Sequence, residues 1–385
     1  MTSEQHEVVV VGAGPGGSTA AIGLMQRGVR DVLVIDRDEF PRDKTCGSGL
    51  SPNAIALADR LGLGDELRAR SQPLLSVKIV TPGGRSMVLA GNAAAVILLR
   101  RDFDAMLLTR ATELGARFRG GVKVSTLLRA HGRVVGVKLA DGTEIRARYV
   151  LCADGAHSIF SLDPRPKRTI STLMGWWEGV ETVPGQAEMI FDECVSPLYG
   201  WLFPESPTRV NIGICIDGQD KNGEKTKRNV REVFATFLDR HYRTRLREAR
   251  QLGPLKGHPI AYTTWVAHCT APGALYVGEA ARITHNATGE GISQAMQSGL
   301  YAAETVADIV LRGVDEDAAL RAYTRRHRRR FTAGFLAGHA LRAVVKSPAL
   351  DVVAAISNHP VVRPTLTRVL GSALAGSHVQ DAATA

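Results

Sequence analysis

The sequence of 385 residues predicts an α/β protein in three parts: a domain built on a parallel sheet, a domain built on an antiparallel sheet, and a helical C-terminal region. Three observations predict this organisation. A strand–turn–helix–strand pattern opens the chain, short alternating strands dominate residues 166–265, and an alanine-rich helical pattern follows Val314. The length also suggests about two domains, since domains commonly span about 100 to 200 residues.

The N-terminal pattern begins with an apolar strand and a glycine turn, VVVVGAGPGGS, at residues 8–18. Gly12, Gly14 and Gly17 have the GxGxxG spacing of a Rossmann-type βαβ unit. The first glycine allows a tight turn, the second leaves room for a pyrophosphate, and the third lets the helix pack closely on the strand. The turn therefore predicts a dinucleotide site.

The helix expected over residues 19–27 would direct its unpaired N–H groups and its positive dipole end at that phosphate. A second apolar strand, Val32–Ile35, ends in Asp36, whose carboxylate can accept both hydroxyls of an adenosine ribose. A GxGxxG sequence alone also fits an ordinary glycine-rich turn. The order of strand, turn, helix, strand and acid within about 30 residues favours dinucleotide binding.

A polar loop follows at residues 41–52. Gly47 and Gly49 flank Ser48 there. Because glycine has no side chain, the backbone of this loop can approach a flat ligand closely. Cys46 in the same loop is either a reactive thiol or a small filler. The sequence shows no neighbouring base or helix N-terminus that would activate the thiol, which favours the filler.

The remaining elements follow from apolar periodicity and turn residues. Two-residue turns at 131–132 and 141–142 predict a three-stranded meander that begins near Val122. Its last strand, residues 149–153, is apolar throughout, which is typical of a strand buried in a parallel sheet. The other expected elements are a surface helix over 53–69, two short strands over 77–89 around a turn at 82–84, helices over 105–114 and 230–243, and a strand over 274–277.

Three of the four tryptophans, Trp176, Trp177 and Trp201, fall within residues 166–265. They can form the wall of an apolar pocket, or they can simply fill the core of the sheet. Further on, Gly289 and Gly291 directly precede a helix of small residues. The N–H groups at the start of that helix are available to an anion or to a polarised carbonyl.

The formal charge of +10 and the pI of about 9.6 favour anionic partners. Six arginines lie within residues 321–330 and form either a solvated helix face or a binding surface. The five cysteines contain no close pair, which argues for a reducing compartment and against a disulfide framework or a metal site. The polar N-terminus and the lack of a long apolar run predict a cytoplasmic protein, with peripheral membrane contact left open.

Several stretches together resemble the FAD-dependent oxidoreductases that include geranylgeranyl reductases and aromatic-hydroxylase-type flavin monooxygenases. The general motifs are VGAGPGG with Asp36, the DG turn at 154–155, and VGEAA around Gly278. Three further motifs resemble geranylgeranyl reductases in particular. They are DKTCGSGLSP at 43–52, YGWLFP at 199–204 with VNIG at 210–213, and TGEGI at 288–292.

The resemblance implies a glutathione-reductase-like FAD-binding domain over residues 1–76, 97–165 and 266–312, a substrate domain over 77–96 and 166–265, and the C-terminal region over 313–385. It also implies FAD as the bound cofactor and NAD(P)H as the transient electron donor. Four residues would line the substrate side: Trp176, Tyr199, Trp201 and Phe203. The implied cofactor residues are Gly12, Ala13, Gly14, Pro15, Gly17, Asp36, Arg37, Cys46, Gly47, Ser48, Arg100, Val124, Asp154, Gly155, Gly278, Glu279, Gly289, Glu290, Gly291 and Ile292.

The chain departs from the family at two flavin-facing positions. Glu279 replaces the usual ribityl-binding Asp, and residues 286–287 replace the Pro that usually precedes the TGEG turn. His285, beside that turn, is a candidate proton donor, although a solvent-facing loop histidine is the simpler interpretation. The WxWxIP signature of flavin halogenases is absent, since Trp177 is followed by Glu-Gly.

Three functions compete. The first is a reductase that uses NAD(P)H and FAD to reduce a carbon–carbon double bond of a lipophilic, isoprenoid or polyketide-like substrate, with Cys46, Tyr199 and His285 as candidate proton donors. The second is a monooxygenase on the same scaffold, which performs hydroxylation or epoxidation. The third is a basic, non-catalytic binding protein, which is disfavoured because the arginines lack a nucleic-acid motif. The sequence does not specify the substrate or the oligomeric state.

Overall fold

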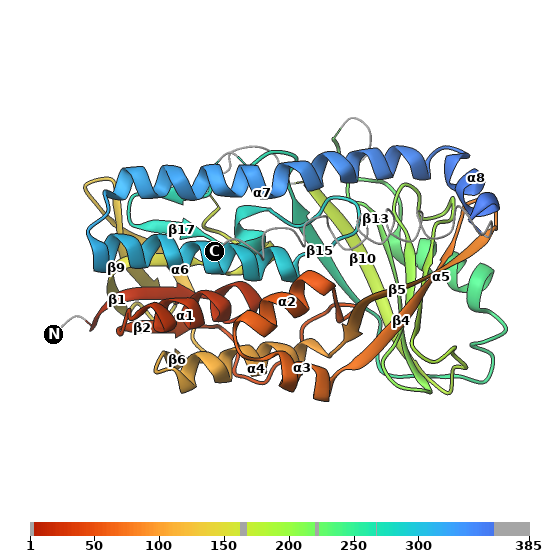
Figure 1. Ribbon diagram of the computed structural model, residues 1–385, viewed down its shortest axis with the longest axis horizontal. Coiled ribbons are helices and arrows are strands. Elements are labelled where there is room, and N and C mark those ends of the chain that lie inside the picture. Colours follow the sequence, from red (N-terminus) through yellow and green to blue (C-terminus); the bar gives the residue numbers. More distant parts are fainter. Residues whose placement is uncertain (1–3, 162–167, 220–222, 267, 358–385) are drawn as a thin grey trace.

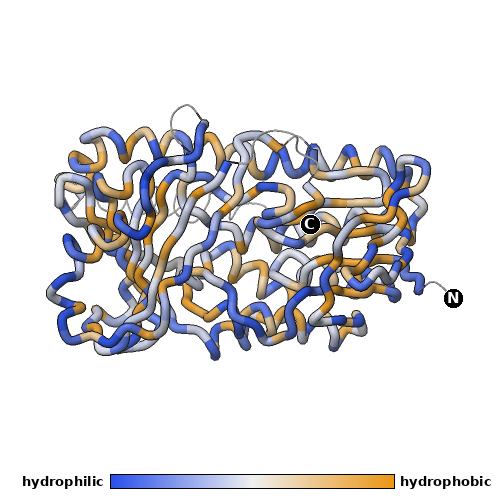
Figure 2. The backbone as a smooth tube through the Cα atoms, turned by 180° about the vertical axis from the view of Figure 1, so that it is seen from behind, coloured by the Kyte–Doolittle hydropathy of each residue, from blue (hydrophilic) through white to orange (hydrophobic). Residues whose placement is uncertain are grey.

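The computed structural model describes residues 4–161, 168–219, 223–266 and 268–357 (Figure 1). Two large sheets form its framework, and the long helix α7, Glu316–Val345, runs along one side over both (Figure 1). Apolar segments are concentrated along the strands, and hydrophilic segments lie on many of the outer loops and turns (Figure 2). The prediction of an α/β fold with a mainly parallel sheet and a second sheet is confirmed.

The first sheet is mainly parallel and is built around β1, Glu4–Val11. Residues 8–11 of β1 are buried and apolar, as expected for a strand covered on both faces. The neighbours β2 and β9 pair with β1 in parallel. The strand order is β16 (Thr270–Ala271), β17 (Ala274–Tyr276), β9 (Glu144–Cys152), β1, β2 (Val32–Ile35) and β6 (Arg117–Arg119).

Helix α1 spans Pro15–Arg27 and begins four residues earlier than expected. Proline is favoured in the first helical turn because it has no N–H to leave unpaired there. A Cβ on Gly17 would lie 1.8 Å from the carbonyl oxygen of Gly12, so helix and strand make the predicted close contact. Helix α6, Ile292–Arg312, packs against α1 in a similar way, since a Cβ on Gly299 would lie 2.4 Å from the Gly16 oxygen.

The predicted meander is present as β7 (Val124–Ala130), β8 (Arg133–Leu139) and β9. The N-terminal half of β9 pairs with β8 in antiparallel fashion, whereas its apolar C-terminal half joins the parallel sheet beside β1. The helix expected over residues 53–69 is wrong in detail. It is divided into α2 (Pro52–Arg60) and α3 (Gly64–Arg70), because Gly62 between them has a φ of +75°. The two helices are also not confined to the surface, since Leu57 and Leu67 are buried. Helix α4 spans Arg100–Glu113.

The second sheet contains β4 (Gln72–Val80), which lies near its middle. The sheet is antiparallel as expected except at one place, where β4 pairs in parallel with β11. Helix α5, Val230–Tyr242, covers one face with its buried phenylalanines. The other strands are β3 (Gly49–Leu50), β5 (Ser86–Ile97), β10 (Arg168–Glu178), β11 (Gln186–Ile190), β12 (Gly200–Pro204), β13 (Arg209–Asp217), β14 (Arg250–Gln251) and β15 (Lys256–Tyr262).

The C-terminal helices are α7 and the short α8, Ala349–Ile356, with Pro348 between them. Tyr323, His327, Phe331 and Phe335 bury one stripe of α7 at four-residue spacing. The part of the expected C-terminal region beyond residue 357 lies outside the described residues. In the part of the chain that the structure describes, no helix combines the length and apolar character needed to cross a bilayer.

Candidate active site

A cavity of about 1180 Å³ extends from the glycine turn before α1 to the face of the second sheet. The loop after β2, the start of α6 and strands β4, β5, β10, β11 and β12 contribute to its walls. The structure thus brings together residues that are more than 280 positions apart in the sequence, from Val11 to Ala295. The predicted site residues that line the cavity are Gly12, Gly14, Pro15, Asp36, Arg37, Cys46, Gly47, Ser48, Arg100, Val124, Asp154, Gly155, Tyr199, Trp201, Phe203, Gly278, Glu279, Gly289, Glu290, Gly291 and Ile292.

Four predicted site residues do not line this cavity. Ala13 is fully buried, and Gly17, in the first turn of α1, packs against the Gly12 carbonyl. Trp176 is on the same face of β10 as the lining residue Met174 but lies beyond the lining, where its indole N–H donates to Glu205 over 2.8 Å. The fourth residue, His285, belongs to the loop before α6 and is treated below.

The glycine end of the cavity is preorganised by Asp36. Its carboxylate accepts the backbone N–H of Ala13 over 2.7 Å and that of Asp38 over 3.0 Å, so the strand end and the turn are held together. Gly12 has a φ of +101°, and a Cβ there would lie 2.4 Å from the oxygen of Ala153. Only glycine fits this position without displacing the backbone.

Arginine side chains lie beside this turn. Arg100 donates two hydrogen bonds to Asp104, of 2.6 and 2.7 Å. Burial disfavours its positive charge, but the Asp104 carboxylate outweighs that cost and raises the pKa of Arg100. Arg42, which no sequence motif indicated, lies 3.2 Å from the same carboxylate, and its Nη1 is buried without a hydrogen-bond partner. A Cβ on Gly14 would lie 3.7 Å from Nη2 of Arg42, so a second donor group faces the phosphate turn.

These residues fit an anionic dinucleotide. The turn leaves backbone space where a phosphate must approach, α1 presents its N-terminus there, and Arg42 supplies an unused donor. FAD would therefore be held by the turn, by Arg42 and by Asp36 at its adenosine end. Bound there, it would supply two-electron chemistry to the rest of the cavity.

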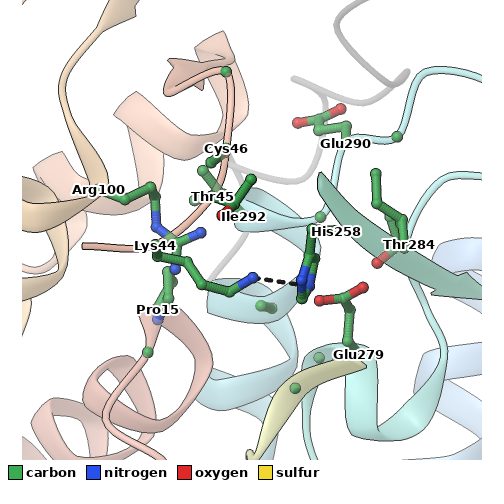
Figure 3. A pocket seen from close by; sticks show the side chains of 18 of the residues that line it. Pro15, Lys44, Thr45, Cys46, Arg100, His258, Glu279, Thr284, Glu290 and Ile292 are labelled. Atoms are coloured by element: carbon green, nitrogen blue, oxygen red, sulfur yellow. Dashed lines mark hydrogen bonds between the residues drawn. The ribbon is translucent and has the colours of Figure 1, made fainter. Parts of the chain in front are cut away.

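A cluster of titratable side chains occupies the middle of the cavity (Figure 3). Lys44 Nζ lies 2.8 Å from Nε2 of His258, and the His258 ring lies edge-on to His157, with centroids 5.2 Å apart. Burial, followed by the charge of Arg100, lowers the pKa of Lys44 to about 8. Burial, followed by the charge of Lys44, lowers the pKa of His258 to about 3. Sequence motifs did not indicate this pair, since no local pattern connects a loop lysine with a histidine on β15.

The expectation that His285 is a solvent-facing loop residue is wrong, because its side chain is buried under α7. Its Nε2 donates to the carbonyl oxygen of Gly334 in α7 over 2.9 Å, and its Nδ1 accepts from the backbone N–H of Thr288 over 3.1 Å. Burial lowers the pKa of His285, which favours the neutral ring that these bonds require. His285 therefore fixes the loop before α6 to α7.

Glu290 connects the same loop to α2. Its Oε1 accepts hydrogen bonds from the hydroxyls of Ser51, the N-cap of α2, and Ser293, in the first turn of α6. Its Oε2 is buried without a hydrogen-bond partner. Burial raises the pKa of the Glu290 carboxyl, and the two serine hydroxyls only partly oppose this effect.

The second half of the cavity is an aromatic and aliphatic chamber. Tyr199, Trp201 and Phe203 alternate along β12 on the cavity face, with successive ring centroids 6.2 and 6.1 Å apart. The Tyr199 hydroxyl donates to the Thr288 carbonyl over 2.5 Å, and the Trp201 N–H donates to Asn211 over 2.7 Å. The polar ends are thus satisfied, and the ring faces remain for an apolar ligand. Other lining residues are Leu74, Val77, Leu89, Met174, Ala187, Met189 and Ile260.

The fold and this cavity define an FAD-dependent oxidoreductase. A family model described as "FAD binding domain" matches residues 5–335, and the chain belongs to that family. The menaquinone reductase of Mycobacterium tuberculosis is 33% identical over 332 residues, which cover 78% of this chain and 76% of the relative. The digeranylgeranylglycerophospholipid reductase of Methanothrix thermoacetophila is 29% identical over 354 residues, which cover 84% and 83%.

Solved structures show the same fold. A geranylgeranyl bacteriochlorophyll reductase-like protein from Thermoplasma acidophilum superposes with a TM-score of 0.78 at 23% identity, covering 95% of this chain and all of the other. A flavin-dependent brominase superposes with a TM-score of 0.79 at 22% identity, covering 95% and 93%. Because reductases and halogenases share this scaffold, the fold alone does not select the reaction.

Proposed function

We propose that the protein reduces carbon–carbon double bonds of a lipophilic, isoprenoid-type substrate, with electrons passed from NAD(P)H through FAD. The observation that carries this proposal is the apolar chamber, which is continuous with the nucleotide end of the cavity. A long apolar chain gains about 25 cal/mol for each Å² that it buries in such a chamber. The lining of β12 offers ring faces rather than free polar groups, which suits a hydrocarbon better than a polar aromatic acid.

The relatives support the same substrate class. Two of the similar proteins are named as a menaquinone reductase and a digeranylgeranylglycerophospholipid reductase, and both names denote lipophilic substrates. The motifs shared with geranylgeranyl reductases lie on the wall of this chamber, from Cys46 to Ser48 and from Tyr199 to Phe203. A monooxygenase on the same scaffold would need the same cavity, so product analysis has to separate the two.

Double-bond reduction consumes one proton for each pair of electrons delivered. Of the three candidate donors, His285 lies outside the cavity lining, and the Tyr199 hydroxyl is already donated to a backbone carbonyl. Cys46 lines the cavity beside Arg100. Glu290 also lines it, and its raised pKa favours a protonated carboxyl. We propose Cys46 and Glu290 as the groups that hold the proton near the substrate.

The test is a single-turnover reaction without oxygen. The yellow holoenzyme is reduced with NADH or NADPH, mixed with menaquinone or a digeranylgeranyl phospholipid, and followed by flavin absorbance and by mass spectrometry of the lipid. We expect flavin reoxidation together with a product that has gained two hydrogens per double bond reduced. The nicotinamide cofactor that reduces the flavin faster is identified as the electron donor.

The same reaction is repeated with isotopically labelled oxygen. A product that contains labelled oxygen, with no saturated product formed under nitrogen, would contradict the reductase and establish the monooxygenase. Reduced flavin that reacts with neither lipid under nitrogen, yet reacts with an aromatic acid and oxygen, would also contradict the reductase in favour of the monooxygenase.

A further inference from the structure

The Lys44–His258 hydrogen bond joins two parts of the fold across the cavity. Lys44 lies on the loop after β2, which belongs to the first sheet, whereas His258 lies on β15 of the second sheet. Both side chains line the cavity and point toward each other (Figure 3). The proposed reaction does not use this pair.

The direction of the hydrogen bond follows from chemistry. A lysine ammonium group can only donate, so Nε2 of His258 must accept, and the proton of the neutral ring must sit on Nδ1. With its pKa lowered to about 3, His258 stays neutral throughout the physiological range. Lys44 donates one N–H to His258 and keeps two more for a ligand in the cavity.

The surroundings of the pair carry an excess of positive charge. The carboxylate of Asp104 is already engaged by Arg42 and Arg100. The carboxylate of Glu279 accepts a hydrogen bond from the backbone N–H of Ala261 over 3.2 Å, so its negative charge is also partly engaged. The charged and titratable groups that act on Lys44 are Arg100, Glu279, Cys46 and Arg42, and those that act on His258 are Lys44, His157, Arg100 and Arg37.

We propose that Lys44 is a binding residue for the negative charge of FAD and that it takes up a proton as the cofactor binds, with His258 positioning its ammonium group. An anion that enters this part of the cavity meets Lys44 beside Arg42 and the glycine turn. The proposal rests on the FAD cofactor of the proposed function. It is independent of the reaction that the bound FAD performs.

The consequence is a pH-dependent affinity for FAD. Without the ligand, about half of the Lys44 side chains are neutral near pH 8, because burial and Arg100 disfavour the charge. The FAD anion binds the protonated form, so binding above that pH requires proton uptake and the affinity falls. If bound FAD restores the ordinary lysine pKa of 10.5, the dissociation constant rises about 30-fold between pH 7 and pH 9.5.

The test measures flavin release from the holoenzyme. The protein is diluted stepwise at pH values from 7 to 9.5, and free FAD is followed by its fluorescence. Lys44→Arg keeps the charge over the whole range, so its affinity should be nearly independent of pH. Lys44→Met should bind FAD about tenfold more weakly at pH 7, also with a flat profile. Lys138→Met, at a half-buried position outside the cavity lining, removes the same charge and should retain the wild-type profile.

The positioning role of His258 has its own readout. A neutral acceptor stabilises the ammonium form of Lys44, so His258→Leu should move the midpoint of the pH profile to a lower pH. His258→Gln offers a side-chain oxygen as acceptor and should restore the midpoint. A variant that merely disturbed packing would weaken FAD binding equally at every pH.

Two outcomes would overturn the proposal. Tight FAD binding by Lys44→Met with the wild-type pH profile would show that Lys44 does not contact the cofactor's charge. A flat wild-type profile would exclude proton uptake and would leave the reductase proposal intact. A wild-type protein that holds no flavin at any pH would instead contradict both proposals together.

Discussion

At the scale of single residues, the glycine turn shows how different the three positions of one motif are. Gly12 needs its positive φ, and Gly17 has carbonyl oxygen where its Cβ would be. Gly14 has an ordinary extended backbone with a φ of −69°, and a Cβ there would meet only Arg42 at 3.7 Å. The first and third glycines are therefore required by the protein, and the second by the ligand.

This difference predicts opposite effects for two substitutions. Gly17→Ala should lower the free energy of unfolding by about 3 kcal/mol, because its methyl group collides with backbone. Gly14→Val should leave the unfolding free energy nearly unchanged but abolish flavin binding, because its side chain fills the space of the phosphate. Denaturant unfolding and the flavin absorbance of purified protein measure the two effects. A Gly14→Val protein with full flavin content would refute the assignment of the turn.

At the scale of elements, α7 acts as a clamp on the loop before α6. Besides the bond to His285, the carbonyl of Phe335 accepts from the side chain of Asn286 over 3.1 Å. Arg342 donates to the backbone oxygen of Asn286 and is paired with Asp217 of β13. These hydrogen bonds to α7 therefore fix the backbone of the loop directly before the TGEG turn.

Two glycines of α7 provide a matched test of the clamp. A Cβ on Gly338 would lie 1.9 Å from the side-chain oxygen of Asn286, whereas a Cβ on Gly334 would lie 3.6 Å from His285. Gly338→Ala should displace the loop, lower the Tm and increase flavin fluorescence. Gly334→Ala should be neutral, or more stable by up to about 1 kcal/mol, because alanine favours helix. Equal behaviour of the two variants would show that the clamp does not hold the loop.

At the scale of the whole molecule, the chamber on the second sheet should determine which substrate fits. Met189→Trp should narrow the chamber and raise the KM for a long isoprenoid lipid roughly tenfold, while flavin content stays at the wild-type level. Trp176→Phe should leave turnover close to wild type, because Trp176 lies outside the cavity lining and its indole N–H is held by Glu205. Steady-state kinetics under nitrogen check both variants. A large loss of activity in Trp176→Phe alone would show that the substrate extends beyond this cavity as far as Trp176.

The sequence predicts those features that depend on local chemistry. The strand Val32–Ile35, the glycine turn and the hairpin turns of the meander appear where they are expected. The burial of His285, the parallel β4–β11 pair and the Lys44–His258 bond depend on contacts between distant segments. Periodicity gives no information about such contacts. Lys44 lies in the motif at 43–52, but the resemblance assigns it no role. For the same reason, the sequence could not show that Trp201 reaches the cavity whereas Trp176 lies outside its lining.

The packing of α1 against α6 also affects how the protein can be made. The nascent chain presents α1 early, but the surface that covers it, including Gly299, is about 280 residues further on. Strand β9 pairs with β1 on one side and with β17 on the other, so this part of the sheet is also incomplete until β17 has been synthesised. The N-terminal third therefore cannot finish folding while it leaves the ribosome. It must stay shielded from aggregation until most of the chain has been synthesised.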